Sequence, residues 1–272
     1  MLPYALFDTH THFDVEEFAL DRIELAQQAK ARGVEKLLLI GFVAERFQAL
    51  QQTQQQLQQV DQTPQCLLAP GLHPVYVEQH RPADLQALER FLNRYSCVAI
   101  GEIGLDRFLP QHKNAAIQAQ QQQYFMAQIE LAKRYDLPVL LHIRKAHAEC
   151  LAILKQLKFQ HGGIAHAFSG GVEEAKALVK LGFKLGITGQ ITQPNAKKLL
   201  QVVQQLGAEH LVIETDCPDM TPRCCYDQHQ SRQRNTPANL PYVLTALAEV
   251  LQMPCATLAE ILWRNSHQAL RL

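Results

Sequence analysis

Two histidines separated by one residue end the first apolar stretch of the chain, in the run Phe7-Asp8-Thr9-His10-Thr11-His12. Alternate residues of a strand project to the same side, so the rings of His10 and His12 can reach one metal ion, with Asp8 beneath them as support. Because the chain contains 12 histidines, such a pair also arises by chance. Its meaning therefore depends on where the other candidate ligands fall.

Further histidines and carboxylates follow the later apolar runs of the sequence. They are His73, Glu102 with Asp106, His142 with Arg144, His166, and Glu214 with Asp216. Four histidines and two carboxylates form the ligand set of a two-metal hydrolytic centre, in which one carboxylate is shared by ions about 3.5–4 Å apart. Glu102 lies on the fourth predicted strand, between the histidines of the first strand and those of the fifth and sixth, so we expect it to be the shared carboxylate.

Other residues near these ligands have expected supporting roles. Asp216 can contact a metal ion and accept the proton of an attacking water, which predicts a general base. Glu214 lies deeper on the same strand and is expected to orient a ligand histidine, as is Asp8. His142 alone could be an ordinary core histidine, but Arg144 faces the same way and could hold a phosphate or carboxylate oxygen.

The elements that must position these residues form a repeating pattern. Eight short runs are apolar throughout, as in strands covered on both faces, at residues 4–7, 36–40, 66–69, 97–100, 138–141, 163–167, 183–187 and 211–213. Helical periodicity recurs between and after them, at residues 23–31, 85–95, 124–135, 172–181, 237–251 and 257–270. The order predicts one domain over residues 1–272, an α/β (β/α)8 TIM barrel.

Two alternatives arise along the chain. An open doubly wound sheet would need a glycine-rich turn after its first strand, where this chain has histidines. The glutamine-rich residues 48–62 could be an interaction tract, but a weak apolar stripe favours a solvated surface helix.

Composition limits the classes of protein that fit. The 26 basic and 26 acidic residues give a formal net charge of zero, unlike a dedicated duplex-DNA binder. No run of 18 uncharged apolar residues and no signal peptide is present, so we expect a cytoplasmic protein without membrane contact and without an obligate protein partner. The seven cysteines are expected to be buried thiols, although Cys224, Cys225 and the nearby Cys217 could form a soft metal site.

Six motifs in register resemble those of the TatD family of metal-dependent deoxyribonucleases, closest to its YjjV-type metal-dependent hydrolases. They are Phe7-Asp8-Thr9-His10-Thr11-His12-Phe13-Asp14, Gly71-Leu72-His73-Pro74, Gly101-Glu102-Ile103-Gly104-Leu105-Asp106, His142-Ile143-Arg144, His166-Ala167-Phe168-Ser169-Gly170 and Glu214-Thr215-Asp216-Cys217-Pro218. The resemblance runs from residue 7 to the C-terminal helix.

The resemblance implies an amidohydrolase-like TIM barrel that cleaves DNA with two divalent ions. One ion would be held by His10, His12 and Asp216, the other by His142 and His166, with Glu102 bridging. The chain departs from the family where Arg107 replaces a frequent tyrosine, where Thr236 replaces a glutamate, and at Ala167 and Leu270. These departures leave every ligand in place and concern the shape of the substrate pocket.

Taken together, the sequence predicts a two-metal phosphodiesterase or deoxyribonuclease. A metal-bound hydroxide would attack phosphorus, Asp216 would be the base, and His73, Arg144 and Arg107 would steady the phosphate. The alternative keeps the dinuclear centre and changes the substrate to a small amide, lactone or ester. A barrel that stores metal without turnover is a third class. Zinc, magnesium and manganese all remain open as the divalent ions.

Overall fold

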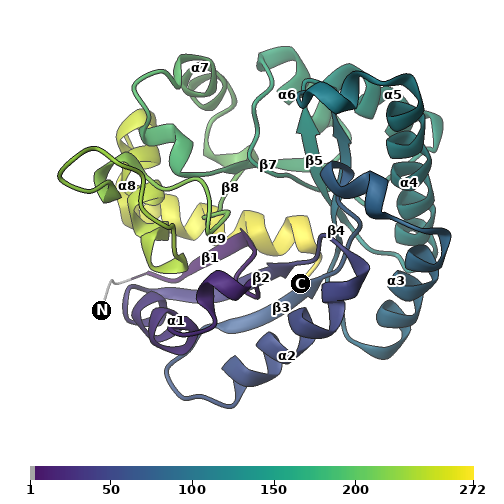
Figure 1. The fold of residues 1–272 in the computed structure, drawn as a ribbon. Coiled ribbons are helices and arrows are strands. Elements are labelled where there is room, and N and C mark those ends of the chain that lie inside the picture. The colour runs from purple at the N-terminus through teal and green to yellow at the C-terminus, as the bar shows by residue number, and fades with distance from the viewer. Residues whose placement is uncertain (1–3) are drawn as a thin grey trace.

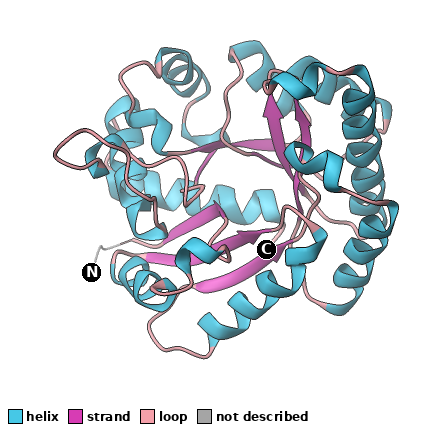
Figure 2. Ribbon diagram, viewed as in Figure 1, coloured by secondary structure: helices cyan, strands magenta, loops and turns pink. Residues whose placement is uncertain are grey.

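A ring of parallel strands surrounded by helices makes up the fold. The computed structural model describes residues 4–272, and Figures 1 and 2 show the strands inside the layer of helices. The strands are β1 (Leu6–Thr11), β2 (Val34–Ile40), β3 (Gln65–Ala69), β4 (Ile100–Asp106), β5 (Val139–Arg144), β6 (Gly163–Ala165), β7 (Phe183–Ile187) and β8 (Leu211–Ile213). Each of the eight predicted apolar runs therefore contains or overlaps one strand.

One helix follows each of the first seven strands, and two follow the eighth. The helices are α1 (Arg22–Ala31), α2 (Phe47–Gln58), α3 (Pro82–Arg94), α4 (Ala115–Arg134), α5 (His147–Gln156), α6 (Val172–Lys180), α7 (Lys197–Leu206), α8 (Leu240–Leu251) and α9 (Cys255–Leu270). This alternation confirms the predicted (β/α)8 barrel and excludes the open doubly wound sheet. All the described elements belong to the barrel or pack on it, while the single-domain organisation stays a prediction.

Hydrogen bonds across two seams close the barrel. The strands form parallel sheets of order β1-β2-β3 and β4-β5-β6-β7-β8. At one seam Val98 N donates to Leu68 O at 3.0 Å, and at the other Asp216 N donates to His10 O at 2.9 Å. The second seam thus joins two of the predicted metal ligands through the backbone.

The barrel has an inner core and an outer core. Side chains from the strands fill the inner one, and the C-terminal helix α9, yellow in Figure 1, covers it with Trp263, Ala269 and Leu270. The outer core lies between the strands and the surrounding helices. Because Phe7 at the start of β1 contacts this cover, with its ring centroid 6.2 Å from that of Trp263, α9 closes the barrel at the N-terminal end of the strands.

Three strands continue beyond their apolar runs. The sequence predicts the catalytic side chains just after the strands, but His10, Glu102 and His142 lie inside β1, β4 and β5. All seven residues of β4 are buried, the carboxylates included. Apolar patterning ends a strand too early here, because these polar residues face an enclosed polar centre instead of water.

Two glutamine-rich segments of the sequence form helices. The segment at 48–62 forms α2 to Gln58, with Leu50 and Leu57 buried in the outer core. Helix α4 begins at Ala115 instead of residue 124, and the glutamines Gln121 and Gln128 are both buried in it. Hydrophobic periodicity assigns such glutamines to the surface. In the structure they instead form hydrogen bonds with the backbone next to His73 and at Asp106.

Within residues 4–272, no single helix is long and apolar enough to cross a membrane. Pro237–Leu251 and Cys255–Leu270 pass that test only as a pair, by length and composition, and are bent by 110°. Cytoplasmic location stays a prediction.

Candidate metal centre

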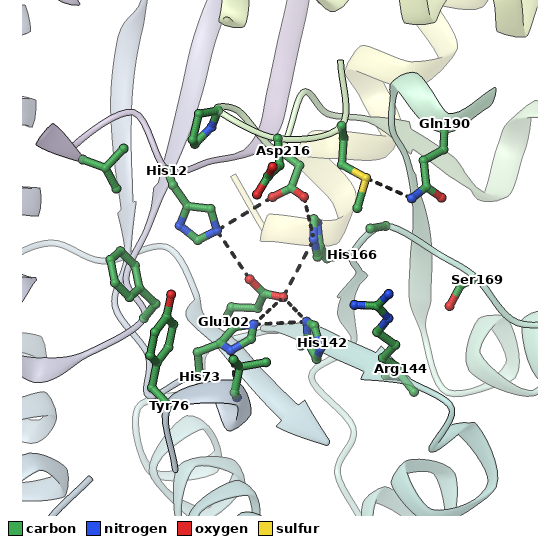
Figure 3. Close-up of a pocket in the computed structure, with 18 of the residues that line it drawn as sticks. His12, His73, Tyr76, Glu102, His142, Arg144, His166, Ser169, Gln190 and Asp216 are labelled. Carbon is green, nitrogen blue, oxygen red and sulfur yellow. Dashed lines mark hydrogen bonds and ion pairs between the residues drawn. The ribbon is translucent and has the colours of Figure 1, made fainter. Parts of the chain in front are cut away.

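The carboxylate of Glu102 lies in the middle of five histidine rings, and Figure 3 labels all of them except His10. Glu102 Oε1 lies 2.7 Å from His142 Nδ1, 3.2 Å from His73 Nε2 and 3.8 Å from His166 Nε2. Glu102 Oε2 lies 3.2 Å from His10 Nε2 and 3.6 Å from His12 Nε2. Only 2% of the side chain is exposed. Strands from distant parts of the sequence therefore bring the predicted ligands together around one buried acid.

Three of these histidines have an acceptor at the nitrogen that points away from the centre. His12 Nδ1 donates to Ile40 O at 3.3 Å, and His142 Nε2 donates to Asp106 Oδ2 at 3.0 Å. His166 turns Nδ1 to Glu214 Oε1 at 2.9 Å. A carbonyl or carboxylate fixes the proton on the outer nitrogen, so the inner nitrogen of each neutral ring offers its lone pair.

His73 has the opposite arrangement. Its Nδ1 accepts a hydrogen bond from the backbone N–H of Val75 at 3.0 Å. Burial lowers the pKa of His73 to about 4, which keeps the ring neutral. The single proton therefore lies on Nε2, facing the centre, where it suits His73 to donate a hydrogen bond better than to bind a metal ion.

The residues present fit a metal centre. Both ring nitrogens of His10 are buried without a hydrogen-bond partner among the described residues, although Nε2 faces two carboxylates. Three groups of side chains have the spacing to hold an ion, namely His10, His12 and Asp216; His10, Glu102 and His166; and His73, Glu102 and His142. His142 and His166 share Glu102 but do not fall into one group.

Asp216 closes the centre from the end of β8. Its backbone is in the left-handed region, with φ of 53°, which aspartate tolerates better than most residues. Its Oδ1 lies 3.7 Å from the Nε2 atoms of both His10 and His12. Burial raises the pKa of Asp216 to about 6, offset by His166 and His12, so the group is ionised at neutral pH and can accept a proton.

The negative charges of the buried carboxylates favour the binding of cations. Burial alone would raise the pKa of Glu102, but the surrounding histidines hold it well below its usual value. Burial opposes the charged forms of His142 and His166 as well, yet the carboxylates around them raise their pKa values to about 9 and about 10. In the metal-free chain, protons on these rings balance the carboxylates, and a bound cation can replace them.

The two predicted supporting carboxylates lie behind the ligands. Glu214 Oε1 accepts the N–H of Ala167 at 2.7 Å besides facing His166, and Gly186 leaves the space, since a Cβ there would lie 2.3 Å from Glu214 Oε1. Asp8 does not touch either histidine ring. It accepts hydrogen bonds from Thr215 N at 2.9 Å and Thr215 Oγ1 at 2.5 Å, and so fixes the segment that carries Asp216.

The two predicted phosphate-binding arginines differ. Arg144 lines a cavity of about 530 Å³ above the centre, with its guanidinium carbon 3.6 Å from the ring centroid of Phe108. Arg107 does not line that cavity, and its guanidinium pairs with both oxygens of Glu149, at 2.6 and 3.1 Å. The structure does not support a substrate contact for Arg107, because its guanidinium nitrogens already bond to Glu149, Gln121 and the backbone oxygen of Asp106.

Sequence reasoning gave no role to several residues that support the centre. Asp106 holds His142 and also faces His112 Nδ1 at 3.1 Å, and Gln121 Oε1 accepts the N–H of Asp106 at 3.1 Å. Gln128 holds the loop before His73 through Leu72 N at 2.7 Å. A second acid in the buried run of β4 is a signal for Asp106, whereas nothing in a glutamine-rich helix marks the two buried glutamines.

The cysteines take no part in the centre. Among residues 4–272, no cysteine belongs to a group with metal-binding spacing. Cys217 is buried with Sγ 2.7 Å from Thr11 Oγ1, and burial raises its pKa well above the usual value. The Sγ atoms of Cys224 and Cys225 are 3.9 Å apart, but within the described residues no third ligand joins them, so the structure does not assemble the soft metal site considered from sequence.

The chain is similar to known proteins over nearly its whole length. Residues 7–271 match the family model described as TatD related DNase. The uncharacterized metal-dependent hydrolase YjjV of Escherichia coli is 35% identical over 96% of this chain and 95% of its own length. The 3'-5' ssDNA/RNA exonuclease TatD of Salmonella typhimurium is 33% identical over 89% of this chain and 90% of its own. The crystal structure of the Escherichia coli YjjV protein, a TatD homolog, superposes with a TM-score of 0.86 at 34% identity, covering 98% of both chains.

Proposed function

The chain belongs to the TatD family of metal-dependent hydrolases, and on that premise we propose that it cleaves phosphodiester bonds of nucleic acid at a centre of two divalent ions. The observation that carries the proposal is the position of Glu102, whose two oxygens face histidines on opposite sides. A carboxylate so placed suits a bridge between two ions. The name of the Salmonella relative supports nucleic acid as the substrate.

His10, His12 and Asp216 would hold one ion, and His142 and His166 the other, with Glu102 between them. When bound, the ions polarise phosphoryl oxygens and lower the pKa of water. Zinc, manganese and magnesium all suit nitrogen and oxygen ligands to differing degrees, so the identity of the ions is left to measurement.

Three residues of the chain have direct tasks in this reaction. Asp216 takes the proton of the attacking water, since it is ionised at neutral pH and borders the cavity. His73 donates its Nε2 proton in a hydrogen bond to a phosphoryl oxygen. Arg144, whose guanidinium is fixed by Phe108, pairs with a phosphate oxygen from the opposite wall.

Substitution Glu102→Ala tests the centre. We expect metal-dependent cleavage of DNA to fall below detection and metal content to drop, because both ions lose a shared ligand. Metal analysis and a nuclease assay on purified protein measure this. The control is Glu173→Ala, an exposed glutamate of α6 whose ion pair is with Lys176 one turn away. Full activity in Glu102→Ala would contradict the proposal.

The same centre acting on a small amide, lactone or ester is the second candidate. The zero net charge favours it, since a nucleic-acid enzyme commonly has a basic surface. Salt titration separates the two on a panel of substrates. For a single-stranded substrate, log kcat/KM falls with log salt by about 0.7 per phosphate contact, whereas a neutral ester shows no such slope.

The salt slope can be assigned to one residue. Arg144→Ala should make the slope shallower by about 0.7, the share of one phosphate contact. Arg134→Ala, an exposed α4 arginine paired with Glu89, should leave it unchanged. Equal slopes in wild type and Arg144→Ala would remove Arg144 from the phosphate site.

A further inference from the structure

An aromatic pair forms one wall of the cavity above the centre. Phe42 lies in the loop after β2, and Tyr76 lies on the short 3-10 helix Pro74–Gln79 after β3. Their ring centroids are 5.4 Å apart with 37° between the ring planes, and both residues line the cavity. Figure 3 shows the Tyr76 ring beside His73, on the far side of the centre from Arg144.

The two aromatic rings pack against His12 and His73 of the centre. The Phe42 ring centroid is 5.5 Å from that of His12, and the Tyr76 centroid is 5.8 Å from that of His73. Nε2 of each histidine is within 3.6 Å of Glu102. A planar group stacked on Tyr76 would therefore be separated from Glu102 by the His73 side chain alone.

The pair does not resemble the aromatic pairs of the core. Phe47 and Phe91 have the same centroid distance of 5.4 Å, but they are 4% and 7% exposed. Tyr76 is 36% exposed and Phe42 is half-buried, with both facing the cavity. A core role does not explain an aromatic face left open beside an active centre, since exposing it forgoes the free energy of burial.

The opposite wall is polar and basic. Arg144, Ser169 and Gln190 line it (Figure 3). The cavity thus has an aromatic face on one side of the centre and phosphate-binding groups on the other. A nucleotide has the same two-sided chemistry, because one sugar links an aromatic base to a phosphate.

We propose that Tyr76, backed by Phe42, is the stacking platform for the nucleobase next to the cleaved phosphodiester bond, and so determines which phosphodiesters are substrates. This rests on the proposed function and deepens it. Every base has a π face, so stacking on Tyr76 favours any base-bearing phosphodiester over one that lacks the base, with little preference among bases.

The test uses a substrate with one cleavable bond. Dithymidine joined by a single phosphodiester is compared with the two analogues in which the thymine on one side or the other is replaced by hydrogen. The metal-loaded enzyme should cleave dithymidine with a kcat/KM about tenfold higher than that of one of the two analogues, which identifies the stacked base. The preference should lie mainly in KM, because stacking already occurs in the bound substrate.

Variants at the wall assign the preference. Tyr76→Ala should bring the ratio of base-bearing to base-free kcat/KM close to one, Tyr76→Phe should keep the wild-type ratio, and Tyr76→Leu, which keeps apolar bulk, should still lose it. The control is Tyr242→Ala, a tyrosine of α8 that is 38% exposed and does not line the cavity, for which the ratio should not change. Thermal unfolding and metal content verify that each variant is folded and loaded.

The outcomes separate the two proposals. Cleavage of all three compounds at similar rates by wild type, or an unchanged ratio in Tyr76→Ala and Tyr76→Leu, overturns the stacking platform and leaves phosphodiester hydrolysis intact. Failure of wild type to cleave any phosphodiester, with hydrolysis of a small ester or lactone instead, overturns the proposed function and the platform together.

Discussion

At the scale of single residues, the atom behind each imidazole decides its chemistry. His142 and His73 lie side by side, with Nδ1 of one 3.1 Å from Nε2 of the other. Asp106 behind His142 accepts a proton, whereas the N–H of Val75 behind His73 donates one. One residue type can therefore supply both the proposed metal ligands and a hydrogen-bond donor within a single centre.

Asp106→Asn should weaken metal binding by about 10- to 100-fold, because the amide no longer fixes the outer proton of His142 as a carboxylate does. Activity should return in part at high metal concentration, since every ligand is still present. Metal titration followed by calorimetry measures the change. Asp136→Asn, at an exposed ion pair with Arg271, serves as the control, and equal affinity in both variants would contradict the role of Asp106.

At the scale of elements, the strands have a working end and a closed end. The proposed ligands lie at the C-terminal ends, while α9 covers the N-terminal ends with Leu270, which is 2% exposed in the inner core. Gly104 shows how closely the strands must approach near the ligands. Its φ is 144°, and a Cβ there would lie 2.1 Å from His142 O. The backbone thus sets the distance between Glu102 on β4 and His142 on β5.

Leu270→Ala should lower the free energy of unfolding by about 2–4 kcal/mol, from lost burial and the cavity that remains. The metal content of the folded protein should not change, because the substitution is at the closed end. Urea denaturation and metal analysis test both statements. Leu20→Ala, at a fully exposed leucine, should have little effect on unfolding, and a loss of metal in Leu270→Ala would show that the two ends are coupled.

At the scale of the whole molecule, the centre joins both ends of the chain. Its side chains come from β1, β4 and β5 and from the segments after β3, β6 and β8, and Asp216 and His10 also meet at the seam that closes the barrel. Bound ions would therefore hold together strands that the backbone connects only through long crossovers. Ligands that bind only the folded state stabilise it in proportion to their saturation.

Removal of metal with a chelator should lower the Tm by about 5–10 °C. This follows from about 2.7 kcal/mol of linkage at a hundredfold excess over Kd and about 2–4 °C per kcal/mol for a chain of this size. Scanning calorimetry before and after add-back of zinc, manganese or magnesium identifies the ion that restores Tm and activity. The shift should be much smaller in Glu102→Ala, and an equal shift in that variant would place the stabilising metal elsewhere.

The sequence by itself determined the order of strands and helices and, through six motifs, the residues gathered at one end of the barrel. Both are local properties, since apolar runs and motif spacing are written in consecutive residues. It did not determine the ends of β1, β4 and β5, because the polar residues there face a centre that exists only after the barrel closes.

Tertiary structure alone decided the roles within that set. Arg107 pairs with Glu149, 42 positions away, instead of facing the cavity, and Gln121 is buried although its helix has a polar sequence. The proton positions on His73 and His142 depend on Val75 and Asp106, and Tyr76 packs against Phe42 from the loop after β2. Such side-chain contacts join residues of different elements. They arise from three-dimensional packing and cannot be inferred from the spacing of residues along the chain.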